Sequence, residues 1–138
     1  DSLLDLKLSE ATVKRGMVYL AGPFFTLGQR WLIDEARRCL LELGLEVFSP
    51  VHDVGIGSAE DVAPAVLDAL AKSDVEFAIL DGLDSGTLFE LGFARAIDKP
   101  VFVVNQNEAE VDLKMVSGSG CLVFSDFVTA LHHLVWRK

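Results

Sequence analysis

Several features that define functional classes are scarce or missing in this chain of 138 residues, and each absence excludes a class of protein. No apolar run approaches the ~18 residues of a membrane-spanning helix, so no membrane partner is expected. The formal charge is −9 without any cluster of Lys and Arg, which excludes a surface that wraps nucleic acid. Cys39 and Cys121 lack metal-ligand spacing and are expected to be buried thiols in a reducing, cytoplasmic protein.

The signatures of cofactor binding are also missing. The segment GIGSAE, residues 55–60, lacks the third glycine of a dinucleotide fingerprint and does not join a strand directly to a helix. No phosphate-binding loop of the GK[ST] type occurs. His132 and His133 are adjacent on an expected helix without acidic or cysteine neighbours, so they do not predict a metal site. The sequence therefore predicts neither an organic cofactor nor a metal.

What the chain does contain is a regular alternation of short apolar runs and amphipathic stretches. Strands are expected at residues 17–22, 45–50, 74–81, 99–105 and 121–125. Helices are expected at residues 27–44, 62–73, from 85 onward and at 126–138, with a polar loop at 51–61. Alternation of helices with apolar strands predicts an α/β fold, in which a parallel sheet is covered on both faces.

This pattern begins at residue 17, and the chain has the length of one domain. We expect residues 17–138 to form that domain and residues 1–16 to be an N-terminal extension or linker. Because the first residue is Asp1 rather than Met, we also expect the chain to be a piece of a longer, fused protein.

Glu90 is the residue that the helix pattern explains least. Asp84 has the side chain and the position of an N-cap, which places Glu90 in the second turn of the helix. The residues three and four positions away are all uncharged: Gly86, Thr87, Phe93 and Ala94. No local ion pair therefore explains the carboxylate. Glu90 is either solvated surface or a reagent, and it lies near the edge of the sheet at which ligands bind.

Four segments together resemble the nucleoside 2-deoxyribosyltransferase superfamily: VYLAGPFF (18–25), SPVHDVG (49–55), SDVEFAILDGLDSGTLFELGFARAIDKPVFV (73–103) and DLKMVSGSGC (112–121). The most specific element is the pattern D-x-x-D-x-G-T-x-x-E-L-G-x-A, which begins at Asp81. The resemblance runs from about Val18 to the C-terminus. It implies a flavodoxin-like or Rossmann-like three-layer sandwich whose five-stranded parallel sheet has the order 2-1-3-4-5.

The resemblance also implies roles for individual residues. Glu90 matches the nucleophile that attacks the anomeric carbon of the sugar, and Tyr19 matches the strand tyrosine that aims it. Phe24 and Phe25 would wall the base or sugar, or else anchor their loop. His52 and Asp53 would bind substrate, or else form a hydrogen-bonded pair within their loop. Further substrate-binding residues are expected in the same loops: Gly22, Pro23, Asp81, Ser85, Gly86, Thr87 and Met115.

Two aspartates bear on the choice between nucleoside and nucleotide. Asp84 stands where relatives that hydrolyse 5′-monophosphates tend to carry Ser, and its charge would repel a phosphate. As a third catalytic residue it would accept a hydrogen bond from a free 5′-hydroxyl, as well as capping the helix. Asp112 matches a position that relatives lend to a neighbouring subunit, which implies a homo-oligomer with shared active sites. Both features, with the absence of Lys and Arg from residues 22–29, favour a nucleoside.

One position departs from the family pattern. Members usually place an Asp eight residues before the Asp that opens the third strand, here Asp74, and this acid handles the leaving base. Val66 occupies that position in this chain. Asp68 is the nearest carboxyl, but two positions along a helix turn it about 200° away.

The sequence as a whole predicts cleavage or transfer of the N-glycosidic bond of a (deoxy)nucleoside by a transferase or hydrolase. Two alternatives stay open. One is a catalytically weak domain that binds a nucleoside or nucleotide as a sensor or regulator, and the other is a nucleoside 5′-monophosphate N-glycosidase.

Overall fold

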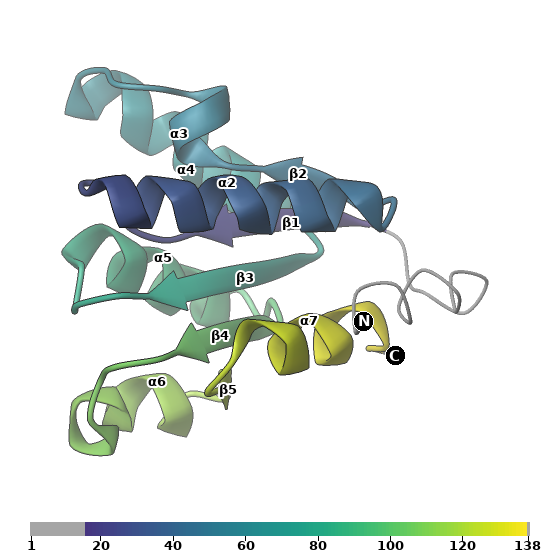
Figure 1. The fold of residues 1–138 in the computed structure, drawn as a ribbon. Helices are drawn as coiled ribbons and strands as arrows, with labels where there is room; N and C mark the ends of the chain where they lie inside the picture. The colour runs from purple at the N-terminus through teal and green to yellow at the C-terminus, as the bar shows by residue number, and fades with distance from the viewer. Residues whose placement is uncertain (1–15, 138) are drawn as a thin grey trace.

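Five parallel strands form one sheet in the order β2-β1-β3-β4-β5 (Figure 1). This computed structural model describes residues 16–137, so the predicted extension lies outside the described residues except for Gly16. The strands are β1 (Met17–Ala21), β2 (Glu46–Phe48), β3 (Val75–Leu80), β4 (Val101–Asn105) and β5 (Leu122–Phe124). The predicted parallel sheet and its order are confirmed.

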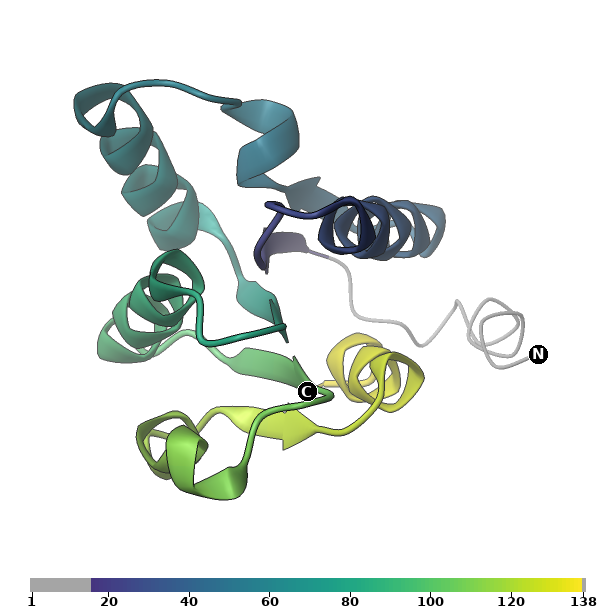
Figure 2. The same ribbon diagram turned by 60° about the vertical axis from the view of Figure 1, so that its left-hand side comes forward.

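Helices cover both faces of the sheet (Figure 2). They are α2 (Leu27–Glu42), α3 (Pro50–Asp53), α4 (Ala59–Lys72), α5 (Ser85–Ala96), the 3-10 turn η2 (Glu110–Leu113), α6 (Lys114–Gly118) and α7 (Phe127–Val135). Helices α2 and α7 pack on one face, and α4 and α5 pack on the other. Within residues 16–137, every helix falls short of the length or apolar character needed to cross a bilayer.

Alternation along the central strand separates the core into two clusters. Val75, Phe77 and Ile79 of β3 point toward α2 and α7, and we call this side the α2–α7 face. Ala78 and Leu80 point toward α4 and α5, on the α4–α5 face. Successive side chains of a strand point to opposite sides, so one strand supplies both clusters.

The segment that the sequence predicted as a polar loop at 51–61 is partly helical. Pro50 opens the short helix α3, where its fixed φ and missing N–H suit a first helical position. The next helix, α4, begins at Ala59 rather than at residue 62, after Ser58 as its N-cap residue. The acidic residues Glu60 and Asp61 lie in its first turn, where the helix dipole favours negative charge. The loop between the two helices is therefore short.

Candidate active site

The hydroxyl of Tyr19 donates a hydrogen bond of 2.5 Å to Oε2 of Glu90. Tyr19 comes from β1 and is fully buried, whereas Glu90 comes from α5 and is only partly buried. The Tyr19 ring stacks on Phe48 of β2, with ring centroids 5.5 Å apart, which helps to fix its orientation. Two residues that the sequence predicted as catalytic are thus in direct contact, although 71 positions separate them.

Burial controls the protonation of both groups. Burial raises the pKa of Glu90, the hydrogen bond from Tyr19 lowers it, and the charge of Asp84 raises it. The resulting pKa is about 7. Burial and the charge of Glu90 also raise the pKa of Tyr19 far above its ordinary value. Tyr19 therefore keeps its proton and acts as a donor. Glu90 changes between acid and carboxylate near neutral pH, and the carboxylate is aimed by a donor that is already in place.

Asp84 is the N-cap of α5, as the sequence predicted. Its Oδ2 accepts hydrogen bonds from the backbone N–H of Thr87 at 2.9 Å and from the Thr87 hydroxyl at 2.7 Å. Thr87 is buried beneath the cap, while Ser85 and Gly86 are exposed at the first turn. The backbone N–H groups of Ser85 and Gly86 at this helix end lie slightly more than one turn before Glu90, where an oxygen-rich ligand can meet them.

The loop before α5 is held by Glu108, a residue that sequence reasoning did not single out. Gly82 has a φ of 78°, and its N–H donates to Oε1 of Glu108 at 2.7 Å. The Asn105 side chain holds Glu108 by bonding to its backbone N–H and carbonyl oxygen. Asp81, a predicted substrate-binding residue, lies partly buried at the start of this loop. The one available signal was the position of Glu108, just after a strand that ends at the same edge of the sheet.

The first loop carries Gly22, Pro23, Phe24 and Phe25 along the same edge. A Cβ on Gly22 would lie 2.7 Å from Cδ1 of Ile33, so glycine allows β1 and α2 to approach closely. The rings of Phe24 and Phe25 stack with centroids 5.5 Å apart, and Phe25 is 73% exposed. An exposed ring is not a buried anchor. Both rings line an open cavity of about 670 Å³, whose other walls are formed by Arg30, Gly55, Ile56, Gly57, Ala59 and Val62.

His52 and Asp53 make separate hydrogen bonds instead of pairing with each other. His52 Nδ1 lies 2.9 Å from the Ser49 hydroxyl, and its Nε2 lies 2.7 Å from Oδ1 of Asp34 on α2. Oδ2 of Asp53 accepts the backbone N–H of Ser49 at 2.7 Å. These contacts tie α3 to α2 and to the end of β2. Their partners lie in loops and on another helix, so local sequence did not reveal them.

Asp112 and Met115 line a groove whose lining does not include Glu90. Both are exposed and line a groove of about 530 Å³ between α5 and α6, together with Leu88, Leu91 and Gly92 of α5. Neither residue lines the cavity of Phe24 and Phe25. Their predicted role in a neighbouring subunit's site stays a prediction.

Helix α4 presents an apolar side chain where the family pattern has an acid. Val66 is buried in the same cluster as Tyr19. Asp68 points outward, and its Oδ2 forms an ion pair of 2.8 Å with Nζ of Lys72. The rotation expected from the helical repeat is observed, and Asp68 does not replace the missing acid.

Glu76 of β3 is a second carboxyl beside the Tyr19–Glu90 pair, and sequence reasoning missed it. Its strand position pairs with Tyr19, and only 1% of the residue is exposed. Neither carboxyl oxygen has a hydrogen-bond partner among the described residues. Burial, followed by the charge of Glu90, raises the pKa of Glu76 well above its ordinary value and so favours the protonated, neutral form of the side chain. The signal was an acidic residue inside the apolar run VEFAIL.

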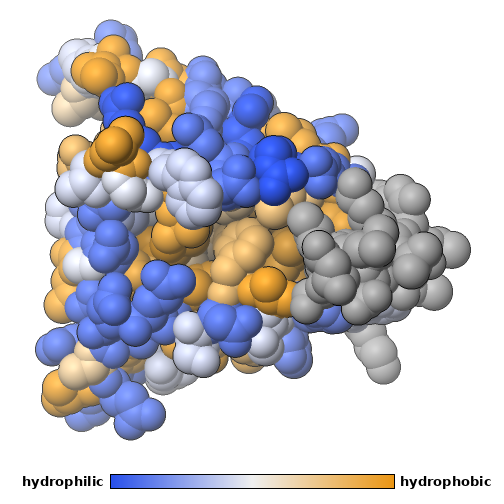
Figure 3. All heavy atoms as spheres, viewed as in Figure 1, coloured by the Kyte–Doolittle hydropathy of each residue, from blue (hydrophilic) through white to orange (hydrophobic). Residues whose placement is uncertain are grey.

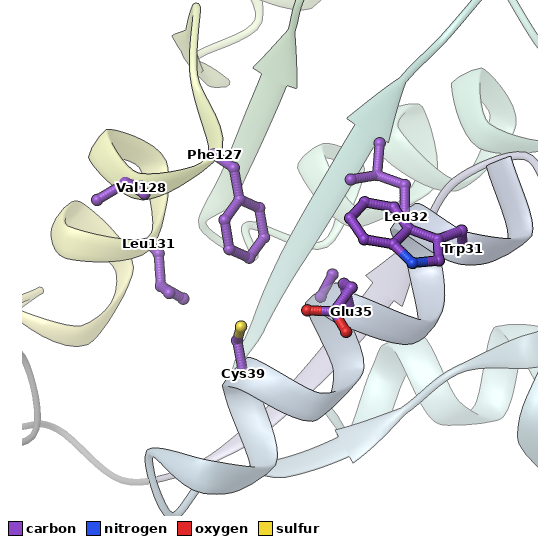
Figure 4. Close-up of a pocket in the computed structure, with 8 residues that line it drawn as sticks. Trp31, Leu32, Glu35, Cys39, Phe127, Val128 and Leu131 are labelled. Carbon is purple, nitrogen blue, oxygen red and sulfur yellow. The ribbon is translucent and has the colours of Figure 1, made fainter. Parts of the chain in front are cut away.

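An apolar groove on the opposite side of the sheet is a poor alternative site. It has a volume of about 260 Å³ and lies between α2 and α7, where Figure 3 shows hydrophobic side chains in a hollow. In Figure 4, Trp31 and Cys39 of α2 face Phe127 and Leu131 of α7 across it. Glu35 is its one charged lining residue, and its carboxylate is bonded to Arg38. The groove therefore lacks the paired reactive groups that Tyr19 and Glu90 provide.

Comparisons with known proteins agree with this geometry. The profile of the nucleoside 2-deoxyribosyltransferase family matches residues 18–127, which include Tyr19, Asp84 and Glu90. The chain is similar to the solved 2-deoxyribosyltransferase of Bacillus psychrosaccharolyticus, with 31% identity and a TM-score of 0.67 over 80% of this chain and 86% of that one.

Two further solved structures share the fold. The 2-desoxiribosyltransferase from Leishmania mexicana is 20% identical, with a TM-score of 0.69 over 88% of this chain and 98% of that one. The CMP N-glycosidase of Clostridium botulinum is 21% identical, with a TM-score of 0.65 over 86% of this chain and 98% of that one. At these identities the likeness shows the fold alone.

Proposed function

This chain belongs to the nucleoside 2-deoxyribosyltransferase family, and we propose that Glu90 is the nucleophile with which it cleaves or transfers the N-glycosidic bond of a (deoxy)nucleoside. The observation that carries the proposal is the 2.5 Å hydrogen bond from Tyr19 to Glu90. It aims a carboxylate at the edge of the sheet where ligands of such folds bind. Because the Glu90 pKa is about 7, a useful fraction is ionised at neutral pH.

The reaction proceeds in two displacements. In the first, the Glu90 carboxylate attacks C1′, the C1′–N bond breaks, and its electron pair goes to the base nitrogen. The positive charge that develops on the sugar is stabilised by the adjacent carboxylate. In the second, water or an acceptor base attacks C1′ of the glycosyl ester, gives up its proton, and restores the Glu90 carboxylate. Water gives hydrolysis and a base gives transfer.

Glu90→Gln tests this role. The substitution keeps the shape but removes the nucleophile, so we expect base release to fall by roughly 10³-fold or more. Chromatography of free base released from nucleosides and their monophosphates measures the loss. Glu60→Gln, which changes an exposed carboxylate on α4, is the matched control and leaves the rate unchanged. A Glu90→Gln protein that retains more than about a tenth of the activity would exclude the covalent role.

Val66 favours one second candidate, a domain that binds a nucleoside or nucleotide with little turnover. Here the site would sense its ligand or regulate a fused partner. The same chromatographic screen separates the two: binding without base release from any nucleoside or monophosphate supports the sensor. Faster release from monophosphates than from nucleosides would instead favour a nucleotide N-glycosidase.

We also propose that the active site is completed in a homo-oligomer, with Asp112 of the partner subunit near the sugar. Support comes from apolar side chains exposed around α5, η2 and α6: Phe89, Val111 and Met115. Burying them between subunits removes apolar surface from water. Light scattering at micromolar concentration should show a dimer or larger, and Val111→Asp should give inactive monomers. A strict monomer with full activity contradicts this arrangement.

A further inference from the structure

The apolar groove between α2 and α7 lies on a face of the sheet that the proposed chemistry does not use. We call it the α2–α7 groove (Figure 4), and it is lined by Trp31, Leu32, Glu35, Ala36, Cys39, Phe127, Val128 and Leu131. Although this surface borders a hydrophobic core, Trp31 is 64% exposed and Val128 is 38% exposed. Exposed apolar surface that gathers in one hollow usually marks a place where another segment or molecule binds.

The size and the border of the α2–α7 groove disfavour a small molecule and a broad protein partner. Its volume of about 260 Å³ lies below the range of about 300–1,000 Å³ typical of small-molecule sites, and its lining is almost entirely apolar. At its border, Arg38 forms ion pairs of 2.8 Å with Glu35 and 2.9 Å with Glu42. A broad interface would take these charges out of water, which costs free energy. A narrow apolar segment can enter the groove and leave them solvated.

Gly16, at the start of the described residues, lies at one end of this groove. Its carbonyl oxygen accepts the N–H of Glu46, which follows the end of α2 at Glu42. A Cβ on Gly16 would lie 3.4 Å from Nη2 of Arg137, which follows the end of α7 at Val135. Both helices that form the groove therefore end beside Gly16. The chain that precedes Gly16 joins the domain at this end of the groove.

The preceding sequence has the side chains to fill the groove. Residues 3–8 read LLDLKL, in which four of six positions are leucine. The chain from Leu8 to Gly16 can reach up to about 26 Å when extended. The groove is shorter, because Trp31 and Cys39 lie about 12 Å apart along the axis of α2. The leucines of residues 3–8 can therefore reach its whole length.

Charge and hydrogen bonding favour the same segment. Lys14 and Arg15 directly precede Gly16 in the sequence. The last turn of α2, beside Gly16, contains Glu42 and no basic side chain, and cations are favoured at the C-terminus of a helix. Nη2 of Arg137 is buried without a hydrogen-bond partner among residues 16–137. Backbone carbonyl groups of the chain that continues from Gly16 can supply this partner.

We propose that the α2–α7 groove is the docking surface of this chain's own N-terminal segment, residues 3–8, whose leucines cover Trp31 and Val128. The contact is intramolecular, so the segment is present at a high effective concentration without any partner in solution. Docking removes apolar surface from water and so stabilises the domain. Because the groove and Glu90 lie on opposite sides of the sheet, this inference is independent of the proposed function.

Fluorescence of Trp31 tests the contact once Trp136→Phe has removed the other tryptophan. In this background, Leu4→Asp/Leu8→Asp places two carboxylates in the segment that docks. We expect a red shift of the Trp31 emission, faster quenching by acrylamide, and a folded-to-unfolded equilibrium constant that is lower by about tenfold or more. Ser2→Asp/Ser9→Asp adds the same charge to the same segment at polar positions and should change none of these. If the leucine variant behaves as the serine variant does, the inference is wrong.

Val128→Asp tests the groove from its other wall. The substitution lies in the first turn of α7, where the helix dipole favours an acidic residue, so the helix should be retained. It should expose Trp31 as the leucine variant does. Because both changes break the same contact, combining them should lower the equilibrium constant by less than about twofold further, and full additivity contradicts the inference. Protection of Trp31 that disappears when the protein is diluted would show that a second copy covers the groove, which also overturns it.

Discussion

The two faces of the sheet are built from the same strands but bury different side chains. The cluster of buried apolar residues on the α2–α7 face contains no hydroxyl or carboxyl group. The α4–α5 face contains the Tyr19 hydroxyl and the Glu76 carboxyl, and Glu90 lies above it. Burial of apolar surface stabilises a fold, whereas an unpartnered carboxyl costs free energy. One face therefore holds the domain together, and the other carries reactive groups at a cost in stability.

Of the substitutions that test this difference between the two faces, Tyr19→Phe is expected to have the largest effect. Loss of the hydrogen bond to Glu90 should lower kcat/KM roughly 10- to 100-fold, because bonds to charged groups contribute about 1.5–3 kcal/mol. The hydrogen bond lowers the Glu90 pKa, so its loss should move the acid limb of the kcat/KM profile above pH 7. Steady-state kinetics between pH 5 and 9 measure both changes.

Leu40→Ala on the opposite face is the control for Tyr19→Phe. Leu40 is fully buried in the α2–α7 cluster, so its truncation should lower the free energy of unfolding by about 3 kcal/mol. The kcat/KM per folded molecule should stay unchanged. Wild-type kcat/KM and an unshifted acid limb in Tyr19→Phe would contradict the assigned role of the hydroxyl.

Substitution of Glu76 tests how much stability its buried carboxyl costs. Its pKa is raised in the folded protein, so folding takes up a proton and stability falls as the pH rises above the unfolded value of 4.5. Glu90 adds to this loss between about pH 4.5 and 7. Glu76→Gln should therefore flatten the decline, with a stability gain over wild type that is larger at pH 8 than at pH 5. Urea unfolding at several pH values measures the slope.

Glu76→Leu separates the charge from the unpaired polar atoms. Because it removes both, we expect it to stabilise the domain by about 1–3 kcal/mol at neutral pH, more than Glu76→Gln does. Parallel curves of stability against pH for wild type and Glu76→Gln would mean that Glu76 does not titrate between the folded and unfolded states.

Asp84→Ser should have the smallest effect. A phosphate beside the Asp84 carboxylate is unfavourable by about 1 kcal/mol or more, so the variant should gain relative activity on 5′-monophosphates by roughly fivefold or more. Ser also caps a helix, and the stability loss should be smaller than in Asp84→Ala. The measurement is the ratio of kcat/KM for a nucleoside to that for its monophosphate, in wild type and in Asp84→Ser. Wild-type preference for the monophosphate would show that Asp84 faces away from the 5′ position.

Local chemistry explains which parts of the site could be predicted. Asp84 caps α5 through Thr87, three residues away, so the contact lies within one stretch of sequence. The apolar strands and their alternation with helices likewise follow from neighbouring residues. The closeness of Tyr19 and Glu90 was predicted only through the family resemblance, because 71 positions separate them.

Other features depended on contacts that no local pattern encodes. His52 bonds to Asp34 on another helix, and Asp53 bonds to the backbone of Ser49, so the hydrogen-bonded pair, which was one of the two alternatives for these residues, does not form. Asp112 and Met115 line a groove beside α5 that Glu90 does not line. Their placement follows from how α6 packs on α5, which spacing along the chain does not specify.

The sequence by itself determined the α/β class, the N-cap at Asp84 and an unexplained carboxylate at Glu90, since each rests on residues within a few positions of one another. Only the tertiary structure decided that β1 and α5 bring Tyr19 to Glu90, and that β3 turns Glu76 toward the same side. Burial sets the protonation of all three groups, and burial is a property of the packed sheet and helices rather than of any one segment.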